Sequence, residues 1–122
     1  MANQWDAISL KNKKKMTKVV RAVVLQMGNS VILRSPVDTG RFRGNWYSSL
    51  NEPINSVDTD GEGLNTTVAK IDVGDIFYFI NNLPYAEKLE FGSSDQAPQG
   101  MVRLTIEEFS RLTDVQAKAI LK

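Results

Sequence analysis

Two long stretches of the chain repeat apolar residues at the spacing of an α-helix. From about residue 11 to residue 34 the apolar positions recur every three or four residues and form one stripe: Met16, Val20, Val23, Met27 and Val31. Pro36 predicts that this helix ends just before it, because proline disfavours helical geometry at the preceding residue. From about residue 100 to residue 120 a second stripe has similar spacing: Val102, Ile106, Phe109, Leu112, Val115 and Ala119. We therefore expect a long helix near each end of the chain.

The middle of the chain contains two segments with the pattern of β-strands. Residues 45–50 follow Gly44 and would place Trp46 and Ser48 on one face. Residues 76–80 are bulky and partly aromatic, and we expect this strand to be buried on both faces. The connections are too short for several parallel crossovers. The fold class that follows is α+β, with a small, mainly antiparallel sheet packed against the two long helices.

The remaining segments predict loops and short helices. Residues 51–63 are rich in acidic residues and glycine and predict a loop. Residues 64–73 fit either a helix or a strand, and we favour a short helix. A further short helix is also expected. Pro84 fits its first position, residues 85–91 would make two turns, and Gly92 would end it.

The length and composition predict one globular domain over residues 1–122. The chain is 42% apolar and 24% charged, which is ordinary for a folded protein. We expect residues 1–9 to be loosely held, with Trp5 tucked onto the surface. No stretch approaches the roughly 18 apolar residues of a membrane span. The N-terminus also lacks the pattern of a signal peptide, so a soluble protein made in a cytoplasm is expected.

The chain contains no cysteine and no histidine, which excludes many kinds of site. Disulfides, thiolate zinc sites and cysteine nucleophiles all require cysteine. Without histidine, serine triads lose their usual base and transition metals lose their commonest ligand. The net charge of +1 argues against a generic nucleic-acid binder. We expect no cofactor, no metal and no small-molecule substrate.

Two segments about forty residues apart combine turn-forming residues with aromatic ones. The first, residues 35–46, has the sequence SPVDTGRFRGNW, and the second, residues 81–94, has the sequence NNLPYAEKLEFGSS. Asp38 can accept a backbone N–H and so cap a turn that continues through Gly40. Both segments are suited to fixing a helix, a turn and a strand relative to one another. The aromatic residues Trp46, Phe77, Phe79 and Phe91 are expected to lie in the core and not to form a ligand cage.

Glu87 and Glu90 lie three residues apart and would share one side of the short helix. Paired carboxylates can act as an acid and a base, so a carboxylate-dependent hydrolase is one interpretation. Nothing else in the sequence completes such a site. We favour a structural role, in which Glu90 pairs with Arg41 or Arg43 and ties the two segments together.

Two further patterns resemble binding motifs only in part. Residues 58–62, DTDGE, resemble part of a calcium loop, but Thr67 stands where the bidentate acid is required, so a solvated loop is favoured. Gly40 and Gly44 are not followed by the Gly-Lys-Ser/Thr of a phosphate loop.

A dense basic cluster lies in the first predicted helix and is followed by Arg21; its members are Lys11, Lys13, Lys14, Lys15 and Lys18. These lysines could contact DNA phosphates, or they could simply form a solvated helix face. No aromatic residue interleaves them, which weakens the case for single-stranded nucleic acid.

The two motif segments resemble the signatures of a tail-component family of long-tailed bacteriophages, the neck or tail-completion family that includes minor tail protein Z. Residues 35–46 are similar to its T-P-V-D-T-G-R-L-R-x-x-W pattern, with Ser35 in place of Thr and Phe42 in place of Leu. Residues 81–92 match its N-x-x-x-Y-A-x-x-x-E-F/Y-G pattern, and an Ala-Pro pair and a final helix follow. The similarity covers about residues 10–115.

The resemblance implies a virion structural protein at the head–tail junction, made in the bacterial host. It implies no catalytic residue and no membrane contact. It implies assembly with further copies, expected to form a ring around the DNA channel, and with adjacent neck or tail proteins. Passive contact between the lysine cluster and packaged DNA is compatible with this role. The residues carried over set the shape of the domain: Asp38, Gly40, Arg41, Trp46, Tyr85, Glu90 and Gly92.

Overall fold

The computed structural model describes residues 4–37, 40–57, 63–91 and 100–121. Its elements follow one another in the order α1 (Gln4–Arg34), η1 (Arg43–Asn45), β1 (Tyr47–Leu50), α2 (Leu64–Val68), β2 (Phe77–Ile80), α3 (Ala86–Glu90), α4 (Val102–Glu107) and α5 (Phe109–Ile120). The α+β class predicted from the sequence is confirmed, as are the antiparallel sheet and the short helix after the 51–63 segment.

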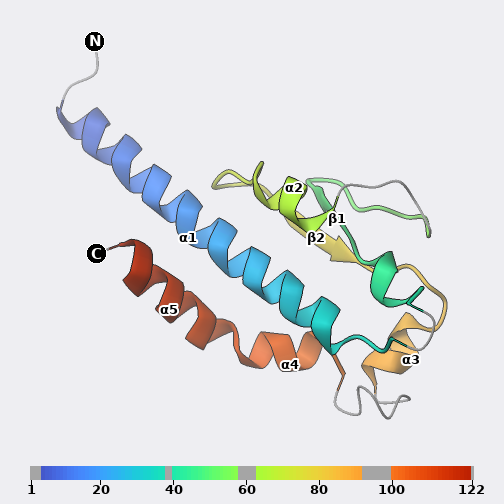
Figure 1. The fold of residues 1–122 in the computed structure, drawn as a ribbon. Coiled ribbons are helices and arrows are strands. Elements are labelled where there is room, and N and C mark those ends of the chain that lie inside the picture. Colours follow the sequence, from blue (N-terminus) through green and yellow to red (C-terminus); the bar gives the residue numbers. More distant parts are fainter. Residues whose placement is uncertain (1–3, 38–39, 58–62, 92–99, 122) are drawn as a thin grey trace.

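The long helix α1 is the spine of the molecule (Figure 1). It packs against α4 and α5 on one side and against α2 on another. The two strands of the described sheet pair antiparallel, from Tyr47 opposite Ile80 to Leu50 opposite Phe77. The first strand is tied to α2 by a hydrogen bond from Ser48 Oγ to Thr67 Oγ1 at 2.7 Å, and both side chains are buried.

Two apolar clusters form the core. One lies where the end of α1 meets the motif segments and the start of α4, and its buried members are Val31, Phe42, Leu83 and Met101. The other lies under α2, and its buried members are Leu64, Val68 and Ile71. Trp46, Phe77 and Phe79 pack against these clusters, but Phe91 is 65% exposed, so the expectation for Phe91 is wrong. Every residue of β2 is half-buried, so the expectation of a strand buried on both faces is wrong. The reason is that the described sheet has only two strands, and each is an edge.

The first helix begins seven residues earlier than predicted, at Gln4, and Trp5 is 68% exposed on it. Residues 4–9 are therefore helical, and Trp5 is not tucked onto the surface. Residues 4–16, which we call the arm, extend past the end of α5 and are exposed, apart from half-buried Lys15 (Figure 1). The predicted stripe is correspondingly buried only in its second half: Met16 and Val20 are exposed.

The C-terminal helix is interrupted at Glu108, which separates α4 from α5. Most of the predicted stripe does not face the core: Leu112 is buried and Val102 packs against the cluster at the end of α1, but the other members are exposed. Instead, the helices turn Thr105, Glu108, Leu112 and Gln116 towards α1, and Gln116 Nε2 donates to Gln26 Oε1 at 2.9 Å. Ile106, Phe109 and Val115 are left about half exposed.

Candidate functional site

The first motif segment closes the end of α1. The last turn of a helix leaves main-chain carbonyls without helical partners. Arg43 supplies a donor for one of them and for the residue after the helix: its Nη2 lies 2.9 Å from the carbonyl oxygens of both Leu33 and Ser35. The Ser35 hydroxyl donates to the Val31 carbonyl and accepts from Trp46 Nε1, each at 2.8 Å. The segment thus folds back and fixes the helix end against the start of β1.

Phe42 joins the two motif segments. Its ring is buried and contacts Trp46 and Tyr85, at centroid distances of 5.9 and 5.8 Å. Trp46 in turn stacks on Phe79 of β2 at 5.1 Å. The side-chain amide of Asn81 donates to the Phe42 carbonyl at 2.9 Å, so the second segment is held by polar as well as aromatic contacts.

Glu90, at the end of the second segment, covers the N-terminus of α4. Its carboxylate accepts main-chain N–H bonds from Met101 at 2.9 Å and Val102 at 2.6 Å. A carboxylate suits this position because the first N–H groups of a helix lack partners and carry partial positive charge. Arg103 adds a contact, since its Nε lies 3.8 Å from Glu90 Oε2. Glu90 thereby ties the end of α3 to the start of α4.

The contacts of Glu90 differ from the expected ones. Within the described residues its carboxylate meets Met101, Val102 and Arg103, and not Arg41 or Arg43. The two motif segments are connected instead through Phe42 and Asn81.

The other shape-setting residues lie in or beside this junction. Gly40 has a positive φ of 74° and accepts the Gly44 N–H at 2.9 Å, which forms the predicted turn. Arg41 is exposed, and its carbonyl accepts the side-chain amide of Asn45 at 2.9 Å. Asp38 and Gly92 lie outside the described residues. The structure thus brings Trp46 and Tyr85 together around Phe42 and places Glu90 at the start of α4.

Replacing Glu90 with Gln should lower the free energy of unfolding by about 1–2 kcal/mol, because charge-assisted bonds to two N–H groups become neutral ones. Urea denaturation followed by circular dichroism measures the loss. Glu87→Gln on the same short helix is the matched control, since Glu87 is exposed and should change stability little. Equal losses in the two variants would contradict the role given to Glu90.

A second polar contact fixes the break between α4 and α5. Arg34, the last residue of α1, donates to the Thr105 hydroxyl at 2.9 Å and pairs with the Glu108 carboxylate. The Thr105 side chain is buried and donates onward to the Met101 carbonyl at 2.8 Å. The hydrogen bond from Arg34 lowers the pKa of Glu108, and the charges of Arg34 and Arg111 add to it.

This pair predicts a loss of stability in acid. A carboxyl with a lowered folded-state pKa stabilises the fold fully above the usual glutamate pKa, about 4.3, and loses that contribution as the pH falls through the lowered value. Melting temperatures measured from pH 7 to pH 3 should therefore fall less steeply for Glu108→Gln than for the native protein. The exposed neighbour Glu107 offers the control, and Glu107→Gln should follow the native profile. Identical profiles for native protein and Glu108→Gln would refute the assignment.

A groove of about 240 Å³ lies between α1, the sheet and α4. Its lining is almost wholly apolar, and Trp46, Phe79 and Ile106 are among the residues that form it. The polar side chain in it, Thr105, is already hydrogen-bonded to Arg34 and Met101. Glu90 is not part of this lining, so the groove does not combine with the Glu87 and Glu90 pair to make a hydrolytic site. Among the described residues no cluster of three or more carboxylates could hold a metal ion.

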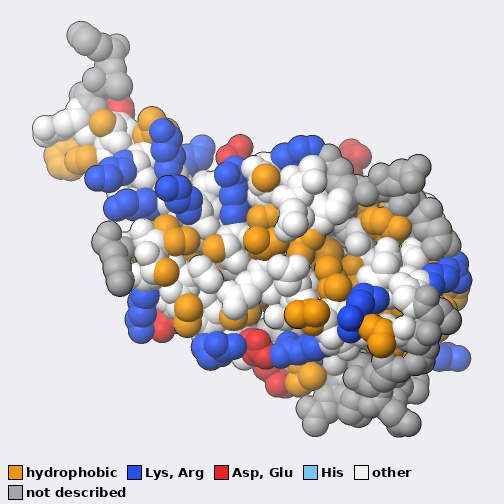
Figure 2. Space-filling view, in the orientation of Figure 1, with side chains coloured by type: hydrophobic (Ala, Val, Ile, Leu, Met, Phe, Trp, Pro, Cys, Tyr) orange, Lys and Arg blue, Asp and Glu red, His pale blue; other side chains and the backbone are white. Residues whose placement is uncertain are grey.

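The lysine cluster lies on and just beyond the arm. Figure 2 shows Lys and Arg side chains gathered over the N-terminal part of α1. Lys11, Lys14, Lys15 and Lys18 surround an open hollow of about 400 Å³ whose other lining residues are Ala7 and Leu10. Lys13, Lys14 and Lys18 are exposed, as is Lys11. Four of the five lysines proposed to face DNA are therefore exposed, and Lys15 is half-buried.

Several residues of the junction were not singled out from the sequence. Asn81 and Arg103 carried no pattern of their own, and Arg34 was treated only as the end of the helix. Ser35 stands directly before Pro36, where a helix must end, and a hydroxyl there is a signal that could have suggested a cap. Glu108 could not be found in this way, because its partner lies far away in the chain.

No described helix is both long enough and apolar enough to cross a bilayer. Comparison of the chain with protein-family models, with curated proteins and with solved structures found no match.

Proposed function

We propose that this chain is a structural protein of a bacteriophage virion that acts at the head–tail junction. In this role it packs against further copies of itself, in a ring around the DNA channel, and against adjacent neck or tail proteins. The resemblance of its two motif segments to the tail-component family supports the proposal. So does the structural use of these segments: Trp46 and Tyr85 pack around Phe42, and Glu90 binds the first N–H groups of α4.

The observation that carries the proposal is the amount of apolar surface left uncovered. Large apolar side chains are exposed along both long helical stretches: Trp5, Ile8, Leu10 and Met16 on the arm, and Ile106, Phe109 and Val115 on α4 and α5. Single exposed apolar residues are ordinary, but repeated ones along a helix mark surfaces that pack against other proteins. A subunit that functions by packing against neighbouring subunits needs such surfaces.

Deleting the gene from the phage genome that encodes this chain tests the proposal. We expect filled heads and separate tails in electron micrographs of the lysate. Adding the purified protein to that lysate should restore joined particles and plaque formation. Normal joined particles in the deletion lysate would refute the proposal.

A second candidate function is contact with DNA through the exposed lysine cluster. This alternative is favoured by the accessible lysines on and near the arm. It predicts retention on duplex DNA that weakens steeply with salt, since each neutralised phosphate releases counterions. Replacing Lys13, Lys14 and Lys15 with Gln should abolish this retention if the alternative holds, and should leave joining of heads and tails intact under the assembly proposal.

A further inference from the structure

The hollow on the arm combines an apolar floor with a basic rim. Ala7 and Leu10 form the floor, and Leu10 is 55% exposed. The rim consists of Lys11, Lys14, Lys15 and Lys18, which we call the lysine face. Within the described residues no ion pair includes a lysine of this face. Like charges spaced three and four residues apart weaken a helix slightly, so an anionic partner would stabilise the arm.

The charges of the chain are concentrated in two places. Residues 11–21 contain five lysines, one arginine and no acid, whereas residues 51–75 contain six carboxylates and one lysine. Three of these carboxylates lie among the described residues: Glu52 and Asp72 are exposed and Asp75 is half-buried. The surface complementary in charge to the lysine face is thus present on the same molecule. A second copy can offer it.

The turn of residues 71–76, which we call the acidic turn, is held by hydrogen bonds and carries both carboxylates and apolar side chains. The Asp72 N–H donates to Asp75 Oδ2 at 2.8 Å, and the Asp75 N–H donates to the Asp72 carbonyl at 3.0 Å. The Ile76 N–H donates to Asn51 Oδ1 at 3.0 Å, which anchors the turn to the end of β1. Val73 and Ile76 are exposed beside the carboxylates. A turn held in this way loses little conformational freedom on binding.

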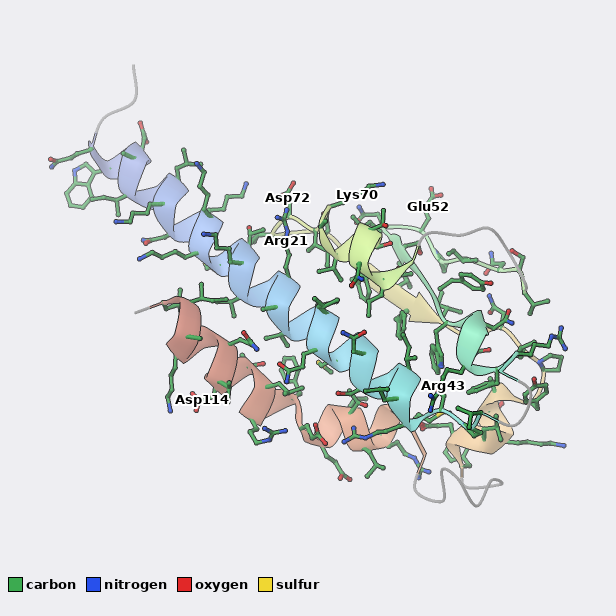
Figure 3. All side chains as sticks on the ribbon, viewed as in Figure 1. Arg21, Arg43, Glu52, Lys70, Asp72 and Asp114 are labelled. Carbon is green, nitrogen blue, oxygen red and sulfur yellow. The ribbon has the colours of Figure 1, made fainter. Side chains whose placement is uncertain are left out.

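Within a single chain, the acidic turn binds a cationic side chain of α1, that of Arg21. Arg21 Nε donates to the Ile71 carbonyl at 2.8 Å, and Arg21 Nη2 lies 3.8 Å from Asp72 Oδ1. Figure 3 shows the Arg21 and Asp72 side chains close together where α1 passes the turn. Lys18 and Lys14 precede Arg21 by three and seven residues, so they lie on the same side of the helix. Seven residues correspond to about 10 Å of helix, which leaves room for another turn on the arm.

We propose that the lysine face of one copy receives the acidic turn of a second copy, in the way that Arg21 receives the acidic turn of its own chain. This inference rests on the proposed function and names the contact between copies that the assembly uses. In it, Val73 and Ile76 cover the apolar floor formed by Ala7 and Leu10, and the lysines surround Asp72. Glu52 follows Asn51, which anchors the turn, and lies at the edge of the contact, beyond Lys70 (Figure 3). The two surfaces differ, so the contact repeats from copy to copy and closes into a ring when the rotation between copies allows it.

The composition of both surfaces favours a protein partner over DNA. A duplex would engage the lysines but would leave Leu10 uncovered, and it would be repelled by the acidic region of the same chain. The acidic turn, in contrast, presents apolar and anionic groups together. Protein interfaces of this kind have an apolar centre and a charged rim.

A charge exchange between two variants tests the contact. The arm variant carries Lys11→Glu and Lys14→Glu, and the turn variant carries Glu52→Lys and Asp72→Lys. Each variant alone brings like charges together, so sedimentation equilibrium should show self-association weakened about tenfold or more, equivalent to about 1.4 kcal/mol. An equimolar mixture pairs each reversed surface with its reversed complement and should associate again. Lys88→Glu with Lys118→Glu, two exposed lysines elsewhere, is the control and should associate as the native chain does.

Cross-linking locates the contact independently of affinity. The chain has no cysteine, so Lys11→Cys and Glu52→Cys chains each carry a single thiol. Mixed under mild oxidation, they should form a disulfide-linked pair of unlike chains faster than either forms pairs of like chains. Lys88→Cys replaces Lys11→Cys in the control mixture and should show no such preference.

Three results would overturn the contact: a native chain that stays monomeric at low salt, variants that associate as the native chain does, or a mixture that does not recover. Loss of duplex DNA binding in the arm variant, with no change in self-association, would assign the lysine face to DNA. The deletion test remains separate, because unjoined heads and tails would uphold the proposed function even if this contact failed.

Discussion

Gly100→Ala is expected to lower the free energy of unfolding by about 2–4 kcal/mol, from backbone strain and overpacking together. Gly100 has a φ of +84°, in the left-handed region that disfavours residues with a Cβ. A Cβ placed there would lie 2.4 Å from the Glu90 carbonyl oxygen and 2.6 Å from Glu90 Oε2. The carbonyl cannot move without moving the end of α3, and the carboxylate cannot move without leaving the start of α4. Urea denaturation followed by circular dichroism gives the measurement.

Gly40→Ala is the matched control for Gly100→Ala. Gly40 also has a positive φ, of 74°, but an added Cβ would meet nothing within 4 Å. Gly40→Ala should therefore lower the free energy of unfolding only by the cost of placing a residue with a Cβ at positive φ, about 1–2 kcal/mol. A loss at Gly100 no larger than the loss at Gly40 would show that the close approach of Glu90 to this position does not contribute to stability.

The sequence predicted which segments would be helices and strands better than it predicted which faces they bury. Spacing alone identified α1 and the C-terminal helical stretch, because apolar residues recur every three or four positions in both segments. It did not show that Val20 and Phe109 would be exposed, since an apolar stripe is equally compatible with the core and with another subunit. In the described structure α5 turns Leu112 and Gln116 towards α1, which leaves Phe109 facing outward. Likewise, α1 buries Thr17 and Val23 and leaves Val20 exposed.

The junction was predictable in outline but not in its contacts. Residues 35–46 and 81–94 were expected to brace helices and strands, and among the described residues the aromatic packing around Trp46 and Phe42 agrees with that expectation. The partner of Glu90 was not predictable. The sequence suggested an arginine partner because opposite charges attract. The first N–H groups of α4 lack helical partners, and they lie within hydrogen-bond distance of the Glu90 carboxylate. The break at Glu108 likewise depends on Arg34, which no local pattern reveals.

Phe42→Ala should cost about 3–5 kcal/mol of unfolding free energy, the largest loss we expect from one truncation in this chain. Phe42 is 4% exposed and packs with Val31, Leu83 and Met101, so its removal leaves a cavity where α1, both motif segments and α4 meet. Phe42→Leu introduces the residue found at this position in the tail-component family pattern. It should lower the free energy of unfolding much less, because leucine refills most of that volume. Thermal and urea denaturation of the two variants measure the difference.

The informative comparison is with Phe109, a residue of the same type on α5 that is 49% exposed. Phe109→Ala should change the stability of the single chain by less than about 1 kcal/mol, because little buried volume is lost. If the exposed stripe of α4 and α5 is a packing surface for other virion proteins, Phe109→Ala should instead reduce the joining of heads to tails when the purified variant is added to the deletion lysate. A variant that is stable but defective in joining would separate the two roles of aromatic residues in this protein. A variant that joins particles as well as the native chain would remove this stripe from the assembly surface.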